Sequence, residues 1–567
     1  MTFFKMVSLR DFIPRSFDLF RKGQYNFGFF KKDLLAGITV GVVALPLAMA
    51  FSIGAGGSPA QGLYTAILAG FTISLLGGSK CQIGGPTGAF VVIISGVIAR
   101  LGMDGLIAAT LLAGLMLIIM GLTGIGRFIK FIPYPVTTGF TTGIALIIFS
   151  QQIKDFFGLT VTGSSPEFIV MWTNYARHAS TVQWITLLAG LGTMGIIIAV
   201  RTFIPRFPAA VAGVVLATLV CYFLDLPVET IGKRFGAIPQ TLPLPRLPVF
   251  SVELINNVFR DSFAIAILAG IESLLSAVVA DGMTGDRHNS NMELVGQGAG
   301  NIVSALFGGI PATGAIARTA TNIKSGAVSP VAGLIHAITL LLFILFLAPL
   351  ASAVPLASLS AVLIVVSYDM SNLQRFWRII RRSPKSDTTV LLVTFVLTVM
   401  VDLTFAVEIG MMLAALLFIK RMIEVVEVRS SQSELAKKIM KWPEANLRKD
   451  PKTDSGKSAL DRQDIEIYEI TGPFFFGVAD TLQHTLRAVN KKPFAFILQM
   501  KEVPVIDTTG IIALESFLAQ CRSDKTQLVL CEVHDQPLRA LQDSGFIDEL
   551  GREHVWDTLE EALMIFT

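Results

Sequence analysis

Two stretches of this chain combine helix-breaking residues and small residues in almost the same order. Residues 84–90 and 308–318 each contain Gly-Gly, then a proline, then Thr-Gly-Ala. Both interrupt apolar sequence, so each predicts a helix that begins inside a hydrophobic region. The unpaired backbone N–H groups of a helix start, with about half a positive charge, suit a small anion. We therefore expect the two helix starts to form an anion site that needs no lysine.

The residues at both predicted starts are mostly small, so a ligand could reach the backbone. Proline- and glycine-interrupted segments at matching places in two halves are typical of transporter binding sites. The alternative is that the small residues only allow close helix packing. We favour a binding site, because packing alone does not explain why both predicted helices are short. The substrate-binding candidates here are Thr87, Gly88, Ala89, Gly314, Ala315 and Ile316.

Two charged residues in apolar sequence are further candidates, because charges inside a membrane are costly and usually functional. Arg318 would add positive potential beside the anion, or it could form an ion pair with Glu272; the sequence leaves both open. Ser276 follows Glu272 by four residues and shares its helix face, so the pair is a candidate ion-coupling site. Apolar surroundings favour the neutral form of a carboxyl group, so Glu272 could carry a proton.

These candidate residues lie in a chain whose composition is that of a polytopic membrane protein. Of 567 residues, 52% are hydrophobic and only 16% are charged, against about a quarter in an average soluble protein. The runs 34–79 and 325–368 contain no Asp, Glu, Lys or Arg, and each could cross a membrane twice at about 20 residues per crossing. The sequence contains fourteen apolar blocks between residues 34 and 419, and the glycine-led blocks 89–98 and 315–323 are the third and tenth.

The distribution of Lys and Arg predicts the orientation and the domains. Basic residues are denser in the loops that follow even-numbered blocks, above all in 375–385, so both termini are predicted to be cytoplasmic. We expect a cytoplasmic lead-in (1–32), a transmembrane domain (33–425), a polar linker (426–463) and a soluble domain (464–567). In the last of these, expected strands at 465–470, 494–498 and 528–533 alternate with expected helices at 478–489, 511–521 and 536–544, which predicts a small α/β domain.

Seven motifs together resemble the sulfate permease (SulP) family of anion transporters with a C-terminal STAS domain, and the similarity covers nearly the whole chain. They are Ala44–Phe51, Gly62–Tyr64, Gly84–Thr87, Ile271–Ser276, Asp281–Gly285, Asn289–Asn291 and the stretch 308–318. The resemblance implies an α-helical polytopic membrane protein with 14 transmembrane segments as 7+7 inverted repeats, a core and a gate domain, and a homodimer. Within the family, the chain is most similar to the bacterial C4-dicarboxylate transporter branch.

The resemblance also implies roles for individual residues. It places Phe51 against the substrate and Arg318 beside it. Where the family's bicarbonate transporter binds sodium with an aspartate and a threonine, this chain has Glu272 and Ser276, so we favour a proton over sodium as the coupling ion. Thr508 lies where related anti-sigma-factor antagonists carry a phosphorylated hydroxyl; a simple helix cap at Asp507–Thr508 is the alternative that we favour.

The sequence thus predicts a secondary active transporter of small anions (C4-dicarboxylate, sulfate or bicarbonate) in the inner or plasma membrane, with elevator-type alternating access. An uncoupled exchanger or channel, a sodium-coupled bicarbonate symporter and a STAS-based regulatory scaffold are the alternatives. No nucleophile–base set, Walker motif or metal cluster is recognisable, so we predict no enzyme activity, cofactor, metal or nucleic acid. A cytoplasmic protein could bind the STAS domain.

Overall fold

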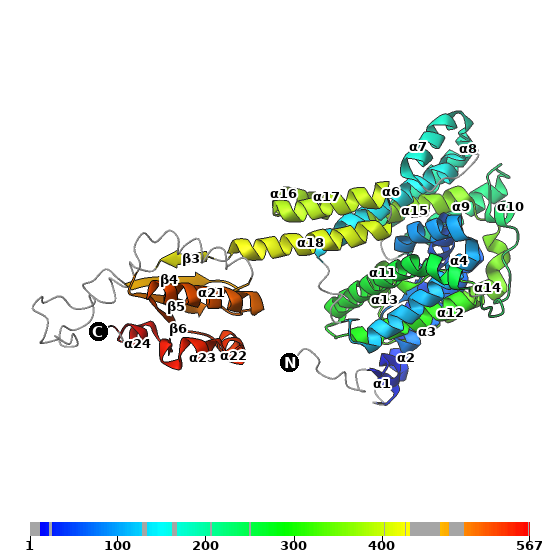
Figure 1. Cartoon of the computed structure of the whole chain (residues 1–567). Helices are drawn as coiled ribbons and strands as arrows, with labels where there is room; N and C mark the ends of the chain where they lie inside the picture. The colour runs from blue at the N-terminus through cyan, green and yellow to red at the C-terminus, as the bar shows by residue number, and fades with distance from the viewer. Residues whose placement is uncertain are drawn as a thin grey trace, which may run out of the picture. The chain divides into compact units, whose positions relative to one another are not determined.

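Long apolar helices fill most of the first part of the chain (Figure 1). The computed structural model describes residues 12–21, 25–126, 133–161, 167–204, 207–248, 251–401, 403–425, 427–430, 465–475, 493–564 and 566. The chain divides into two compact units, Met1–Ala414 and Ala415–Thr567. This division lies inside the last long helix, α18, and therefore before the boundary that we predicted after residue 425.

The described elements of the membrane unit are helices, apart from two short strands. Its first half contains α1 (Arg15–Arg21), α2 (Phe27–Gly54), α3 (Pro59–Leu76), β1 (Gly84–Gly85), η2 (Gly88–Phe90), α4 (Val91–Leu122), α6 (Tyr134–Phe157), α7 (Phe168–Arg177), η3 (Ala179–Thr181), α8 (Trp184–Phe203), α9 (Ala209–Phe223) and α10 (Ile231–Phe235). Its second half contains α11 (Val252–Thr284), α12 (Ser290–Leu306), β2 (Thr313–Gly314), α13 (Ile316–Lys324), α14 (Val331–Ala351), α15 (Leu356–Ser371), α16 (Leu373–Arg382), α17 (Lys385–Met400) and α18 (Leu403–Val425).

Each of the fourteen predicted apolar blocks overlaps a helical element. The third and fourth blocks join in α4, which is broken at Gly102 (φ 67°, ψ −166°), a conformation that glycine adopts far more readily than other residues. Eight helices among the described residues are long and apolar enough to cross a membrane. The count of fourteen crossings, arranged as inverted repeats, therefore stays a prediction.

The helices of the membrane unit contact one another in two groups. In the first group, α4 packs against α11 and α12, and α3 packs against α12 and α14. In the second group, α6 packs against α15 and α17, and α8 packs against α9 and α15. Contacts between the groups are fewer and involve mainly α2 with α15 and α9. Two separately packed groups are what a core and a gate domain would require.

The second unit contains a five-stranded sheet, in agreement with the predicted α/β domain. The strand order is β3 (Glu427–Ser430), β4 (Ile465–Thr471), β5 (Ala495–Glu502), β6 (Gln527–Cys531) and β7 (Val555–Trp556). Only β3 is antiparallel to its neighbour. The helices are α21 (Thr508–Asp524), α22 (Asp535–Asp543), α23 (Phe546–Leu550) and α24 (Leu559–Met564).

Apolar residues of this sheet form two clusters, one with α21 to α23 and one with α24. Part of the predicted linker belongs to the sheet, because β3 pairs with β4. The predicted helix 478–489 and most of the linker lie outside the described residues.

Candidate anion-binding site

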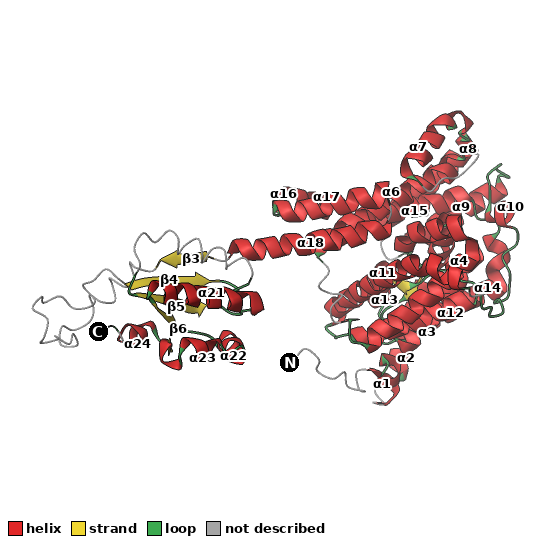
Figure 2. Ribbon diagram, in the orientation of Figure 1, coloured by secondary structure: helices red, strands yellow, loops and turns green. Residues whose placement is uncertain are grey.

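The two glycine-led stretches meet as a short antiparallel pair of strands. Gly84 is opposite Gly314, and Gly85 is opposite Thr313. In Figure 2 these strands lie among the helices, near α13. The Thr313 hydroxyl donates to the Ala269 carbonyl of α11 at 2.9 Å. The β1–β2 pairing therefore fixes the start of η2 next to the start of α13. Helix α4 follows η2 directly.

Neither helix start is closed by a side-chain cap. Thr87 is the N-cap residue of η2 and Ala315 that of α13, and neither side chain accepts a hydrogen bond from the first turn. The Thr87 hydroxyl instead donates to Oε2 of Glu272 at 3.0 Å. Gly88, Ala89, Gly314 and Ala315 are buried. Two backbone N–H groups at these starts are already used, because Phe90 donates to the Thr87 carbonyl at 3.3 Å and Ala315 to the Ile83 carbonyl at 2.8 Å. A ligand would therefore use the other N–H groups of the first turns, which no side chain caps among the described residues.

Arg318 lies behind the strand pair and is only 3% exposed. Its Nη2 donates to the Pro86 carbonyl, while Nη1 has no hydrogen-bond partner among the described residues. Nη1 faces Gly85, since a Cβ on that glycine would lie 2.7 Å from it. No ion pair with Glu272 is formed in the described part of the chain, because Glu272 contacts Thr87 instead. A buried guanidinium therefore has an unsatisfied nitrogen at this place.

Ser276 points toward α13 and not toward a shared site with Glu272. Its hydroxyl donates to the Thr319 hydroxyl at 3.0 Å, and Thr319 also accepts the backbone N–H of Ile83 at 3.1 Å. Ser276 and Thr319 therefore link α11 and α13 to Ile83, the residue before β1. The role of Ser276 in binding a coupling ion stays a prediction.

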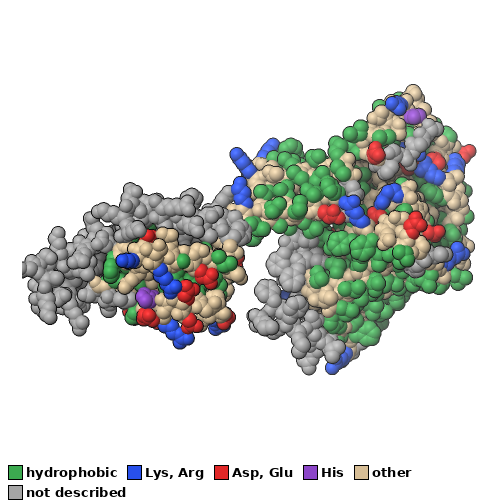
Figure 3. All heavy atoms as spheres, viewed as in Figure 1, with side chains coloured by type: hydrophobic (Ala, Val, Ile, Leu, Met, Phe, Trp, Pro, Cys, Tyr) green, Lys and Arg blue, Asp and Glu red, His purple; other side chains and the backbone are tan. Residues whose placement is uncertain are grey.

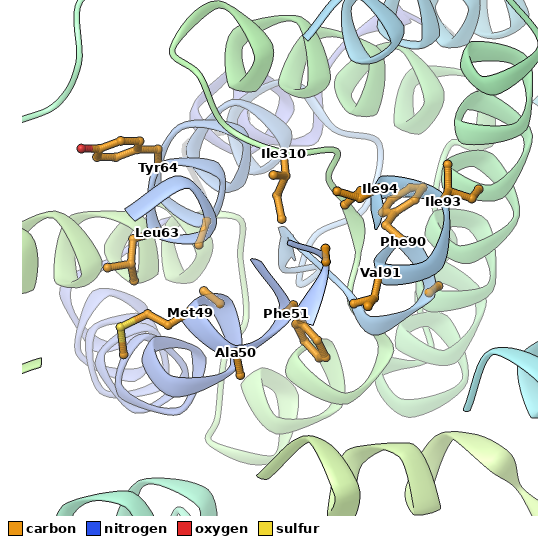
Figure 4. Packing of buried hydrophobic residues seen from close by; sticks show 14 of the residues in the cluster. Met49, Ala50, Phe51, Leu63, Tyr64, Phe90, Val91, Ile93, Ile94 and Ile310 are labelled. Carbon is orange, nitrogen blue, oxygen red and sulfur yellow. The ribbon is translucent and has the colours of Figure 1, made fainter. Parts of the chain in front are cut away.

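Phe51 forms one wall beside the first helix start. A Cβ on Gly88 would lie 3.2 Å from Cε1 of Phe51 and 2.8 Å from the sulfur of Met370. Phe51 belongs to a buried apolar cluster with Phe90, Val91 and Ile310, which Figure 4 shows from close by. Met370 of α15 was not among the predicted residues, because a methionine at the end of an apolar segment carries no distinctive signal.

Ile316 differs from the other candidates, because its side chain is 41% exposed. A ligand would therefore use its backbone and not its side chain.

Glu293 is a buried acid near the site, and the sequence analysis did not identify it. It is fully buried in α12. Its Oε2 accepts the backbone N–H groups of Gly78 and Ser79 at 2.9 and 3.0 Å. Its Oε1 accepts from the Ser273 hydroxyl at 3.0 Å and from Nε2 of Gln297 at 2.9 Å. Its position next to the apolar block 295–307 was the available signal in the sequence.

Gln82 connects this acid to the strand pair. Its Nε2 donates to the carbonyl and the hydroxyl of Ser273 at 3.2 and 3.0 Å. Gly314 lies directly against the Gln82 amide, so that no Cβ would fit there. Hydrogen bonds therefore connect Glu293 through Ser273 to Gln82, and the Gln82 amide lies against Gly314 of β2.

Asp33 makes a similar arrangement at the other end of α13. This fully buried carboxylate accepts the backbone N–H groups of Val328 and Ser329 at 2.8 and 3.2 Å. It also accepts the Ser329 hydroxyl at 2.5 Å and the Tyr25 hydroxyl at 3.1 Å. A buried carboxylate therefore fixes the loop before β1 and another fixes the loop after α13.

Residues of the connection between α11 and α12 form hydrogen bonds with the ends of both helices. Asn289 caps α12 by accepting the N–H of Met292 at 3.1 Å, and Asp281 accepts from His288 Nδ1 at 2.6 Å. Lys80 forms a 2.7 Å ion pair with Asp286. Partial burial raises the pKa of the Asp286 carboxyl, but the hydrogen bond from Lys80, a backbone hydrogen bond from Arg287 and the charges of Lys80 and Arg15 together lower it below its usual value.

In the second unit, Asp507 is the N-cap of α21 and accepts the N–H of Gly510 at 2.8 Å. Thr508 is the first residue of the helix and is exposed. The cap that we favoured is therefore present, and phosphorylation of Thr508 stays a prediction.

Comparison with known proteins identifies the family. The model of the sulfate permease family matches residues 30–394, and the STAS domain model matches residues 457–562. This chain belongs to the sulfate permease family. The YvdB protein of Bacillus subtilis (strain 168), provisionally named a sulfate transporter, is 40% identical over 95% of this chain and 98% of its own length. The bicarbonate transporter BicA of Picosynechococcus is 31% identical over 94% of both chains.

Solved structures give the same fold. The transmembrane domain of a cyanobacterial BicA is 33% identical and superposes with a TM-score of 0.60, covering 69% of this chain and 98% of its own. The murine Slc26a9 structure superposes with a TM-score of 0.83 at 18% identity, covering 97% of this chain and 93% of its own. The chain is thus a mostly helical, multi-pass membrane transporter with a C-terminal STAS domain. None of these relatives is named for a C4-dicarboxylate, so that branch stays a prediction.

Proposed function

We propose that this chain is a secondary active transporter that binds a small oxyanion between the starts of η2–α4 and α13. The observation that supports this proposal is the β1–β2 pair, which joins two helix starts without side-chain caps beside the unsatisfied Nη1 of Arg318. Backbone N–H groups and a guanidinium favour carboxylate or sulfate oxygens. Phe51 and Met370 would cover the apolar side of the anion.

The substrate class follows from the relatives and from the site. YvdB and BicA are named for sulfate and bicarbonate, and the family resemblance adds C4-dicarboxylates. All three classes present oxygens that the same donors could bind. We therefore propose a small-oxyanion site and choose among these substrates by experiment.

Glu272 is the residue through which we propose proton coupling. Its Oε2 accepts from the hydroxyl of Thr87, the N-cap of the first helix start. An anion bound at that start would repel an ionised Glu272, so loading the site would favour uptake of a proton. Glutamate and serine in place of the aspartate and threonine of the sodium-dependent relative make sodium the second choice.

The transport cycle would move the first helix group against the second in an elevator-type step. We place the protein in the inner or plasma membrane as a homodimer with cytoplasmic termini. A cytoplasmic protein partner and phosphorylation at Thr508 would act on the STAS domain.

Uptake into proteoliposomes tests the function. Labelled sulfate, bicarbonate and succinate are offered with an inward proton gradient or an inward sodium gradient, to wild type and to Glu272→Gln. We expect proton-driven uptake of at least one anion, and at least a tenfold loss in Glu272→Gln.

Each other outcome selects an alternative. Sodium-driven bicarbonate uptake would replace the proton by sodium. Exchange that needs no gradient and persists in Glu272→Gln would leave an uncoupled exchanger. Absence of uptake for all three anions would favour a regulatory scaffold.

A further inference from the structure

Helix α16 and the first residue of α17 carry a dense run of cations that the transport mechanism does not use. Between Asp369 and Asp387 the chain contains five basic residues and no acidic residue. All five are exposed, and within the described residues none forms an ion pair with a carboxylate. They are Arg375, Arg378, Arg381, Arg382 and Lys385. Cations in this number without counter-charges indicate an anionic partner.

Helical spacing separates these cations from the face that attaches α16 to the bundle. Arg375, Arg378 and Arg382 follow one another at three and four residues and share one side of the helix. Phe376 and Ile379 are buried on another side, where the Phe376 ring meets Phe395 of α17 at 5.3 Å. The bundle therefore holds α16 with its arginines pointing outward. In Figure 3, Lys and Arg side chains gather at the end of the α16–α17 region, beside hydrophobic surface.

Exposed apolar and aromatic side chains accompany the cations. Trp377 is 53% and Leu373 is 43% exposed. The Arg381 guanidinium lies 5.9 Å from the Trp377 ring, and that of Arg375 lies 5.9 Å from the Tyr134 ring. Aromatic residues next to Lys and Arg are typical of the boundary between acyl chains and headgroups.

We propose that α16 binds anionic phospholipid headgroups. The outward arginines would contact the phosphodiester, and Leu373 and Trp377 would contact the adjoining acyl region. The position fits, because a single residue separates the end of the apolar helix α15 from the start of α16. An acidic protein segment or free phosphate would satisfy the charges, but it would leave the apolar part of the same helix uncovered.

The site has a direct connection to the anion-binding region. Asn372 joins α15 to α16 in the left-handed conformation (φ 43°, ψ 45°), so the joint is a sharp change of direction. Met370, two residues earlier, contacts the position of Gly88 at the first helix start. Headgroup binding to α16 would therefore hold the end of α15 against that helix start.

Lipid binding to purified full-length protein tests the proposal. Labelled phosphatidylglycerol is titrated in detergent, with phosphatidylcholine and inorganic phosphate as competitors. The test variant is Arg378→Gln with Arg382→Gln, since neither side chain makes a ring contact among the described residues. The matched control is Lys501→Gln with Arg539→Gln, which removes two exposed cations from the STAS domain.

We expect phosphatidylglycerol to bind wild type and control alike, and the test variant about 5- to 30-fold more weakly. Arg378→Lys with Arg382→Lys should restore most of the affinity, which separates lost charge from misfolding. Equal affinity of test and control variants would overturn the proposal. Displacement of the labelled phosphatidylglycerol by inorganic phosphate at equal concentration would show a site for free oxyanions and would also overturn it.

Discussion

Arg318 is the side chain on which anion affinity should depend most. Its Nη2 donates a hydrogen bond to the Pro86 carbonyl, but its buried Nη1 has no protein partner among the described residues. A hydrogen bond to a charged group contributes about 1.5–3 kcal/mol. We therefore expect Arg318→Gln to weaken anion binding by about 10- to 100-fold, as measured by calorimetry on purified protein.

Arg318→Lys provides the matching control for this prediction. It keeps the charge but cannot contact Pro86 and an anion with a planar fork, so its affinity should lie between those of wild type and Arg318→Gln. Unchanged affinity in Arg318→Gln would place the anion elsewhere.

Glu293 should matter for stability, although it does not face the proposed anion. Four donors meet its two carboxylate oxygens. In Glu293→Gln an amide NH₂ replaces one carboxylate oxygen. This NH₂ is itself a donor, so it would face the donors that the oxygen had accepted from and leave them without an acceptor. A buried donor without an acceptor costs about 1–3 kcal/mol. We expect a clear drop in the thermal unfolding midpoint of the detergent-solubilised protein.

Glu408→Gln is the control for Glu293→Gln. Glu408 is exposed and lies 3.5 Å from Arg260, so its loss should cost no more than about 1 kcal/mol. Equal unfolding midpoints for the two variants would mean that the four contacts of Glu293 contribute little.

The candidate residues of the site were easier to predict from the sequence than the hydrogen bonds between them. Thr87 could be chosen because it lies in one of two matching glycine- and proline-containing stretches, and Glu272 and Arg318 because charged residues are conspicuous in apolar sequence. Gln82 and Ser273 could not, since their contact joins positions 191 residues apart and no local pattern marks either partner. The sequence also left open an ion pair between Arg318 and Glu272, and only three-dimensional placement showed that each has a different partner.

Among the elements, the short strand β2 should tolerate the least change. A Cβ on Gly314 would collide with the Gln82 amide, which would separate β2 from β1 or displace Gln82 from Ser273. We expect Gly314→Ala to reduce anion affinity at least tenfold. Gly96→Ala in α4 is the control, because nothing lies within 4 Å of the added methyl group.

A second substitution tests the cause of the Gly314→Ala effect. Gln82→Ala removes the obstructing amide, so adding it to Gly314→Ala should recover part of the lost affinity. If the double variant binds no better than Gly314→Ala, the collision with Gln82 is not the reason for the loss.

At the level of helices, periodicity and composition predicted where helices occur but not how they break or pair. Every apolar block overlaps a helix, because long apolar runs have few alternatives in a membrane. The joining of two blocks across Gly102 depends on one residue with positive φ. The β1–β2 pairing was not expected, since two-residue strands of glycine and threonine have no periodicity.

For the whole membrane unit, the two helix groups lead to a prediction about movement. Arg260 of α11 and Glu408 of α18 are 3.5 Å apart. They belong to different groups, because Gly410 of α18 lies against Thr394 of α17 and Val136 of α6. Lys80 and Asp286, by contrast, both lie in connections within the first group. If transport moves one group past the other, a bridge at the first pair should stop it and a bridge at the second should not.

Reversible cross-linking of cysteine pairs measures this difference. The four native cysteines, Cys81, Cys221, Cys521 and Cys531, are buried and would be replaced by serine. A reducible bifunctional thiol reagent then bridges Arg260→Cys/Glu408→Cys or Lys80→Cys/Asp286→Cys. We expect the first bridge to reduce anion uptake at least tenfold until reductant is added, and the second to leave most of it. Uptake that persists with the first bridge intact would contradict movement of the two groups, because a fixed distance between α11 and α18 leaves no room for an elevator step.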